Sequence, residues 1–206
     1  MERHEPEAEK PFSSRSVVDL SHVVDNGTKS YPGDPAPRLD TAADITHDSC
    51  CVTRISLVTH TGTHVDAEAH VIHGGKCLGD YPLTAFSGLA RVADLRGLSV
   101  VDVSALDSIE SCDWLLLCTG QSEKYFGTEP LFTEAFVKAA ARIARKGIGL
   151  DCSGLDREGV ALHRLWFSSG GGLMVENLTD LEMLLSESRI LFAAYPLKLA
   201  AGDGAP

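Results

Sequence analysis

The sequence predicts a single α/β domain built on a mixed β-sheet. Runs of apolar and β-branched residues, typical of strands, recur along the chain. One amphipathic helix lies between two of these runs, which indicates a β-α-β unit. The 206 residues suit one domain of ordinary size, and they contain no internal repeat. We therefore expect a flexible arm over residues 1–15 and one folded domain over residues 16–206.

The N-terminal third is expected to alternate strands with rigid turns. A first strand is predicted at residues 17–20, and Asp-Asn-Gly at 25–27 signals a turn. Two prolines and a glycine exclude regular structure from residues 31–35. This segment is either a plain surface loop or a rigid support that presents Tyr31 to a pocket, and the residues alone leave both open. Alternating polarity predicts a strand at residues 51–59 that leads directly to His60.

The rest of the chain supplies the sheet and its helices. Strands are expected at residues 90–95, 114–118, 148–152, 173–175 and 189–199. Helical segments are expected at residues 104–109, 133–146 and 178–185, with a short helix or turn at His163. Thr133 is expected to cap the clearest helix and Gly147 to end it. No further strand is expected after residue 199.

Composition excludes several classes of protein. A formal net charge of −11 argues against a nucleic-acid partner, which requires a basic face. No window approaches the roughly 18 apolar residues of a membrane span, and the charged first 15 residues resemble no signal peptide, so we expect a cytoplasmic protein. None of the 6 cysteines forms a C-x-x-C pair, which favours buried reduced thiols.

The most informative stretch is HTGTHVDAEAH, residues 60–70. Glycine and β-branched residues disfavour a helix here. In an extended or bent chain, the even spacing of His60, His64 and Asp66 places the three side chains on one side. Two imidazoles and one carboxylate suit zinc, manganese or iron and leave coordination positions open. The stretch therefore predicts a metal site.

His70 and Glu68 extend this stretch. A divalent ion lowers the pKa of water, and a nearby neutral imidazole such as His70 can then accept the proton and deliver it to a leaving group. Glu68 could do the same, but a solvated side chain is an equal alternative. Two histidines and a carboxylate also make the facial triad of non-haem iron oxygenases, so an oxygenase is a second candidate. A catalytically silent metal-binding protein is a third.

The same stretch resembles the H-x-G-T-H-x-D-x-P-x-H signature of the cyclase family of metal-dependent hydrolases, which includes bacterial kynurenine formamidase and isatin hydrolase. The resemblance runs along nearly the whole chain from about Val17. Weaker matching segments occur in the family's order at residues 19–22, 31–35, 117–120, 124–128, 149–151, 176–178, 196–198 and 202–204, and at His163.

The resemblance implies a swivelling β/β/α fold and a homodimer or higher homo-oligomer. It implies one or two divalent ions, with zinc expected first and manganese second. His60, His64 and Asp66 match the ligands of one ion. In members with two ions Asp66 would bridge them, with His163 and Glu176 completing the set.

Catalytic roles are implied by the same resemblance. His70 matches the proton donor and acceptor, and Glu176 also matches a residue that holds water. Tyr31 falls where the family places an aromatic residue against the substrate ring. The implied reaction is the hydrolysis of N-formylkynurenine to kynurenine and formate. Hydrolysis of a cyclic or aryl amide such as isatin is the alternative.

The sequence departs from the family pattern at a few positions. Glu68 replaces the usual proline, where its charge could raise the pKa of His70 or bias the choice of metal. Tyr31 replaces the tryptophan common in formamidases, and residues 151–156 keep only the outer aspartates of their motif. The family's final strand is expected to be missing. These changes bear on the substrate more than on the metal.

Overall fold

The computed structural model describes residues 17–122 and 129–206. The arm expected at residues 1–15 and the family-like segment at residues 124–128 lie outside the described residues.

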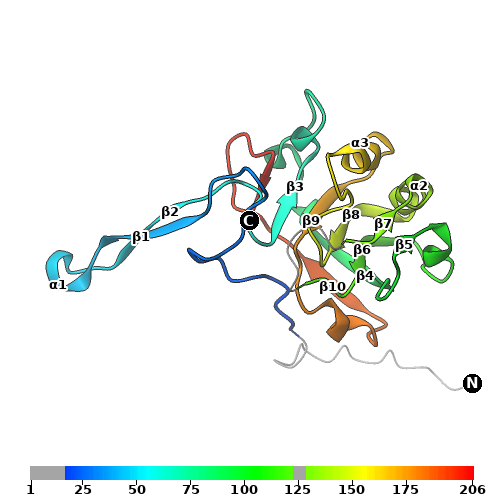
Figure 1. The fold of residues 1–206 in the computed structure, drawn as a ribbon, viewed down its shortest axis with the longest axis horizontal. Coiled ribbons are helices and arrows are strands. Elements are labelled where there is room, and N and C mark those ends of the chain that lie inside the picture. The colour runs from blue at the N-terminus through cyan, green and yellow to red at the C-terminus, as the bar shows by residue number, and fades with distance from the viewer. Residues whose placement is uncertain (1–16, 123–128) are drawn as a thin grey trace, which may run out of the picture.

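A mixed seven-stranded sheet forms the centre of the fold, in the order β10-β4-β6-β8-β9-β3-β11 (Figure 1). Four strands pair in parallel: β4 (Ser87–Asp94), β6 (Cys112–Cys118), β8 (Ala144–Leu150) and β9 (Leu173–Glu176). Three pair antiparallel with their neighbours: β10 (Ile190–Ala193), β3 (His64–Asp66) and β11 (Gly204–Ala205). The predicted α/β domain with a mixed sheet is confirmed.

The predicted β-α-β unit is present as β6, α2 (Glu134–Ile143) and β8. Thr133 caps the helix, accepting a hydrogen bond from the backbone N–H of Phe136 at 3.2 Å. The prediction that the helix continues to residue 146 and ends at Gly147 is wrong, because β8 already begins at Ala144. Gly147 instead allows β8 to pack closely against β9, since a Cβ there would come within 2.3 Å of the Leu173 carbonyl oxygen.

The two faces of the sheet carry separate apolar cores. α2 and α3 (Ala161–Ser168) cover one face. The other face packs against residues 18 and 20, η4 (Leu83–Phe86) and η6 (Leu181–Leu184). β6 is buried on both faces, as expected, with Leu115 and Leu117 in the first core and Trp114 and Leu116 in the second.

A hairpin projects from the body of the protein (Figure 1). It consists of β1 (Arg38–Ala43), the one-turn helix α1 (Ile45–Asp48) and β2 (Val52–Ser56). The strand expected at residues 51–59 is therefore shorter, exposed and outside the main sheet. It does not lead directly to His60, because residues 57–63 form no strand.

Several smaller expectations are corrected. Residues 17–20 form no strand; the chain there makes one bridge, from Ser21 to Leu178, since only part of this segment meets the core. The helix expected at residues 104–109 is the 3₁₀ turn η5 (Val103–Leu106), capped by Asp102 rather than Ser104. The helix expected at residues 178–185 is reduced to η6. The final residues do contain a strand, β11, which pairs with β3.

The remaining elements are short turns and strands. The 3₁₀ turns η2 (Glu68–His70) and η3 (Leu78–Asp80) follow β3, and β5 (Val100–Val101) pairs in parallel with β7 (Leu131–Phe132). The turn at residues 26–27 and the irregular loop at residues 31–35 are present as predicted. Among the described residues, no helix is both long enough and apolar enough to cross a membrane.

Candidate metal centre

The centre is built on β3, the short strand that holds His64 and Asp66. Alternation along this strand turns both side chains to the same face, while Val65 between them enters the core on the other face. Glu176 of β9 lies directly opposite His64 of β3, so its carboxylate lies on that face too. Gly62, with φ of +64°, bends the chain just before the strand.

A first group of ligand atoms comes from His60, His64 and Asp66. Oδ1 of Asp66 lies 2.7 Å from Nδ1 of His60 and 3.2 Å from Nε2 of His64. The His64 ring donates from Nδ1 to the Gly62 carbonyl oxygen at 2.9 Å. Because a carbonyl oxygen only accepts, Nδ1 carries the hydrogen, and Nε2 is the nitrogen that can offer a lone pair to an ion.

A second group comes from Asp66, His163 and Glu176. α3 presents His163 from above the sheet, and its Nε2 lies 2.8 Å from Oε1 of Glu176. All three side chains are buried. One possible ligand atom from each of the three residues lies within 4.8 Å of those of the other two, and the same holds for the first group. Asp66 belongs to both groups, so its two oxygens can face two neighbouring ions.

The residues fit a divalent ion on a separate criterion. Nε2 of His64 and both carboxylate oxygens of Asp66 are fully buried without a hydrogen-bond partner among the described residues. Such orphaned polar atoms are costly, and native proteins rarely leave them without a compensating partner. Their close approach without hydrogen-bond geometry is what ligands directed at a common ion show. Histidine nitrogens and carboxylate oxygens are donors that zinc and manganese accept.

The carboxylates govern the protonation of His60 and His163. Burial alone would lower the pKa of His60, but Asp66 and Asp203 outweigh it and raise that pKa to about 9. Burial likewise opposes protonation of His163, and Asp156 and Glu176 raise its pKa to about 10. An ion binding here must therefore displace protons from these rings.

His70 differs from His60 and His163 in the direction of its pKa shift. It ends the 3₁₀ turn after β3, with its ring centroid 4.1 Å from that of His60 and 6.2 Å from that of His163. Burial lowers the pKa of His70, and the opposing charge of Asp66 does not reverse this effect. A neutral ring beside the ligand groups can accept a proton, as a general base must.

Glu68 contacts the backbone of the loop that follows η2. Its Oε2 accepts a hydrogen bond from the backbone N–H of Lys76 at 3.3 Å, so the side chain spans the following turn. The expectation that Glu68 could raise the pKa of His70 is wrong, because burial lowers that pKa below its ordinary value.

Sequence reasoning missed Asp156 and Asp203 as members of the site. Asp156 Oδ2 lies 2.6 Å from Nδ1 of His163, and Asp203 Oδ2 lies 3.1 Å from Nε2 of His60. Carboxylates that hold the second nitrogen of a ligating histidine are a common feature of metal sites. Both aspartates fall in segments that resemble the family, which was the only signal for them in the sequence.

Tyr31 is 51% exposed in its loop. The structure therefore does not enclose its ring in a closed pocket, and a role against the substrate remains a prediction.

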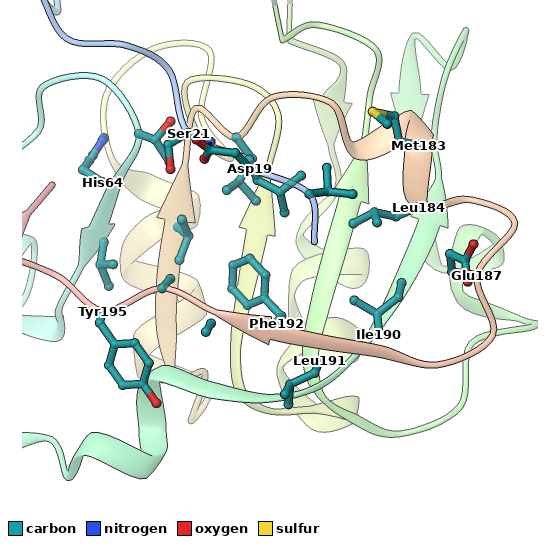
Figure 2. Close-up of a pocket in the computed structure, with 18 of the residues that line it drawn as sticks. Asp19, Ser21, His64, Met183, Leu184, Glu187, Ile190, Leu191, Phe192 and Tyr195 are labelled. Atoms are coloured by element: carbon teal, nitrogen blue, oxygen red, sulfur yellow. The ribbon is translucent and has the colours of Figure 1, made fainter. Parts of the chain in front are cut away.

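A large groove lies on the opposite face of the sheet from α2 and α3 (Figure 2). Its volume is about 690 Å³, and it runs between the segment at residues 18–21, η6 and β10. Val65, Val175 and Phe192 line it, and His64 lies at one end. The lining does not include Asp66, His163 or Glu176, so the groove is separate from the convergent carboxylates.

The chain is similar to known proteins in both sequence and structure. The family model described as "Putative cyclase" matches residues 18–157. This chain belongs to the cyclase family. The membership predicted from the HTGTHVDAEAH stretch is thus confirmed, and the matched residues include the whole stretch.

Known relatives align with nearly the full length of this chain. A kynurenine formamidase from Salinibacter ruber (strain DSM 13855 / M31) is 28% identical over 209 residues, covering 93% of this chain and 94% of that protein. A kynurenine formamidase from Bacillus mycoides (strain KBAB4) is 27% identical over 198 residues, covering 92% of this chain and 93% of that protein.

Solved structures share the fold. One, described as a potential metal-dependent hydrolase with cyclase activity, has a TM-score of 0.73 and 27% identity, covering 92% of this chain and 93% of that one. Isatin hydrolase A from Labrenzia aggregata has a TM-score of 0.76 at 22% identity, covering 92% and 90%. At that identity the likeness to isatin hydrolase concerns the fold alone.

Proposed function

We propose that this cyclase-family protein is a metal-dependent hydrolase that cleaves N-formylkynurenine to kynurenine and formate. The observation that carries the proposal is the buried convergence of two histidine–carboxylate groups on one shared aspartate, Asp66. The substrate follows from relatives named kynurenine formamidase that match 92–93% of the chain.

The ions would be held by the two groups described above. His60, His64 and Asp66 would hold one, and Asp66, His163 and Glu176 a second, with zinc expected before manganese. A divalent ion, when bound, lowers the pKa of water and polarises a carbonyl oxygen. Two ions are favoured over one because Asp66 has two buried oxygens and belongs to two groups of candidate ligands.

His70 would move the proton. In the reaction, water adds to the formyl carbon, the bond between that carbon and the aryl nitrogen breaks, and the nitrogen gains a proton. The partly buried His70 ring, whose pKa burial lowers, would accept the proton from water and return it to the departing nitrogen. Glu176, at the end of β9, would hold both an ion and the attacking water in place.

Three further features belong to the proposal. Tyr31 would contact the aromatic ring of the substrate from its proline-rich loop. The protein would act as a homodimer or higher homo-oligomer, and it would work in the cytoplasm. Size-exclusion chromatography with light scattering tests the oligomeric state.

The direct test is an assay of the purified protein with N-formylkynurenine, with isatin and an aryl amide panel in parallel. We expect one formate for each kynurenine, loss of turnover on chelation and recovery with zinc or manganese. Anaerobic turnover is the control against an oxygenase. Absence of metal-dependent kynurenine formation would refute the proposed substrate, and isatin hydrolysis in its place would assign the cyclic amide.

A further inference from the structure

The C-terminal segment is built into the metal centre. β11 pairs antiparallel with β3, placing Gly204 opposite Asp66. Just before it, the backbone carbonyl of Asp203 accepts a hydrogen bond from the N–H of Ala67 at 2.8 Å. The pairs Val65–Ala205, Asp66–Gly204 and Ala67–Asp203 thus fix the two segments side by side over three successive positions. The side chain of Asp203 is held at the edge of the site as a result.

That side chain reaches two histidines. Oδ2 of Asp203 lies 3.1 Å from Nε2 of His60 and 3.7 Å from Nδ1 of His70. The first distance is a hydrogen bond, and the second is a contact between a charge and a ring nitrogen. An ionised carboxylate only accepts, so Nε2 of His60 must carry the hydrogen. Nδ1 of His60, 2.7 Å from Asp66, is then the nitrogen left to face an ion.

We propose that Asp203 is a positioning residue that fixes the ring of His60 for metal binding and holds the neighbouring His70 ring beside it. It acts through these two rings and does not touch the substrate. The inference rests on the proposed function in that it assumes an ion between His60, His64 and Asp66.

Gly204 supplies an independent geometric observation. A Cβ at this position would come within 2.8 Å of Cε1 of His60 and 3.2 Å of Oδ1 of Asp66. The backbone of the C-terminal segment therefore packs directly against the His60 ring in the orientation that also bonds to Asp203. The hydrogen bond on one side and the close packing on the other fix the same ring.

The test compares three variants of the full-length protein. D203A removes the acceptor, whereas D203N keeps an oxygen that can still accept from His60 Nε2. D107A, a change at an exposed aspartate outside the site, is the matched control. Thermal unfolding of each variant in the presence of a chelator checks that all three fold. Should D203A fail to fold, D203S replaces it in the comparison.

Two readouts are taken without substrate. Zinc affinity is measured by competition with a chromophoric chelator, and the His60 tautomer is read from ¹⁵N–¹H spectra of the zinc-loaded protein. We expect D203A to bind zinc about 10–100-fold more weakly, with D203N recovering most of the loss and D107A unchanged. We also expect D203N, and not D203A, to keep a single tautomer with hydrogen on Nε2.

Zinc affinity of D203A within twofold of the parent protein, together with an unchanged His60 tautomer, would overturn the inference. Since neither readout involves turnover, inactivity toward N-formylkynurenine would count against the proposed function and leave this result standing.

Discussion

Asp156 contacts His163 from outside the candidate metal centre, with its Oδ2 2.6 Å from Nδ1 of His163. The same aspartate accepts backbone hydrogen bonds from Leu162 and His163 at the start of α3. One carboxylate thus accepts two backbone N–H groups in the first turn of α3 and sets which nitrogen of His163 faces Glu176. The orientation of the His163 ring and the start of its helix therefore depend on the same residue.

The first prediction concerns this link. Asp156→Ala should weaken zinc binding about 10–100-fold, because the ring of His163 loses the acceptor that fixes its tautomer. Competition titration with a chelator measures the change. A variant with unchanged affinity would show that α3 alone positions the ring.

Asp151 offers a contrasting prediction, although it belongs to the same motif. Its buried carboxylate accepts hydrogen bonds from Thr119 Oγ1 and N, at 2.6 and 2.8 Å, and from Gly120 N at 2.9 Å. Asp151→Asn should cost about 3 kcal/mol of unfolding free energy, since an amide group replaces one charged acceptor. Denaturant unfolding of the chelated protein measures this loss. Zinc affinity should change less than threefold, and a larger loss would give Asp151 a role in the metal centre.

His70→Ala should separate metal binding from chemistry. We expect unchanged metal content and a fall in kcat of about 10²–10⁴-fold, because the proton acceptor is removed while the ligand groups remain. Metal analysis and steady-state kinetics on one preparation give both numbers. The exposed His73 supplies a matched control, and His73→Ala should retain full activity. Full activity in the His70 variant would remove this residue from the mechanism.

Metal removal should lower stability. Free zinc at about 1,000 times its dissociation constant stabilises a folded protein by about 4 kcal/mol. For a chain of this size, that corresponds to a fall in Tm of about 10 °C on chelation. Differential scanning calorimetry with and without zinc measures the difference. Equal melting temperatures would mean that no ion binds to the folded state.

The effect of chelation should depend on pH. The folded pKa of His60 is about 9 and that of His163 about 10, against roughly 6.5 in an unfolded chain. Each raised pKa contributes stability that is complete below pH 6.5 and is lost as pH rises through the folded value.

The chelated protein should therefore lose stability between about pH 7 and pH 10. The zinc-loaded protein should lose less, because its ligating rings are already deprotonated. Melting curves at several pH values measure the difference in Tm between the zinc-loaded and the chelated protein. This difference should widen as pH rises. A gap that narrows would contradict the predicted protonation of His60 and His163.

Much of the fold was readable from local patterns. Buried strands such as β6 and the capped start of α2 follow from apolar runs and from Thr133, which act over a few residues. The metal stretch was readable for the same reason, since His60, His64 and Asp66 lie within seven positions of one another. Local spacing alone predicted that they share a face.

Tertiary structure decided the remainder. Gly147 was expected to end a helix, but it lies within β8, where the close approach of the Leu173 carbonyl requires glycine. Asp203 lies 143 residues from the histidine it contacts, and only the pairing of β11 with β3 brings the two together. The sequence by itself determined which residue types could hold an ion. The sheet determined which distant carboxylates would orient them, because contacts over that separation leave no local pattern.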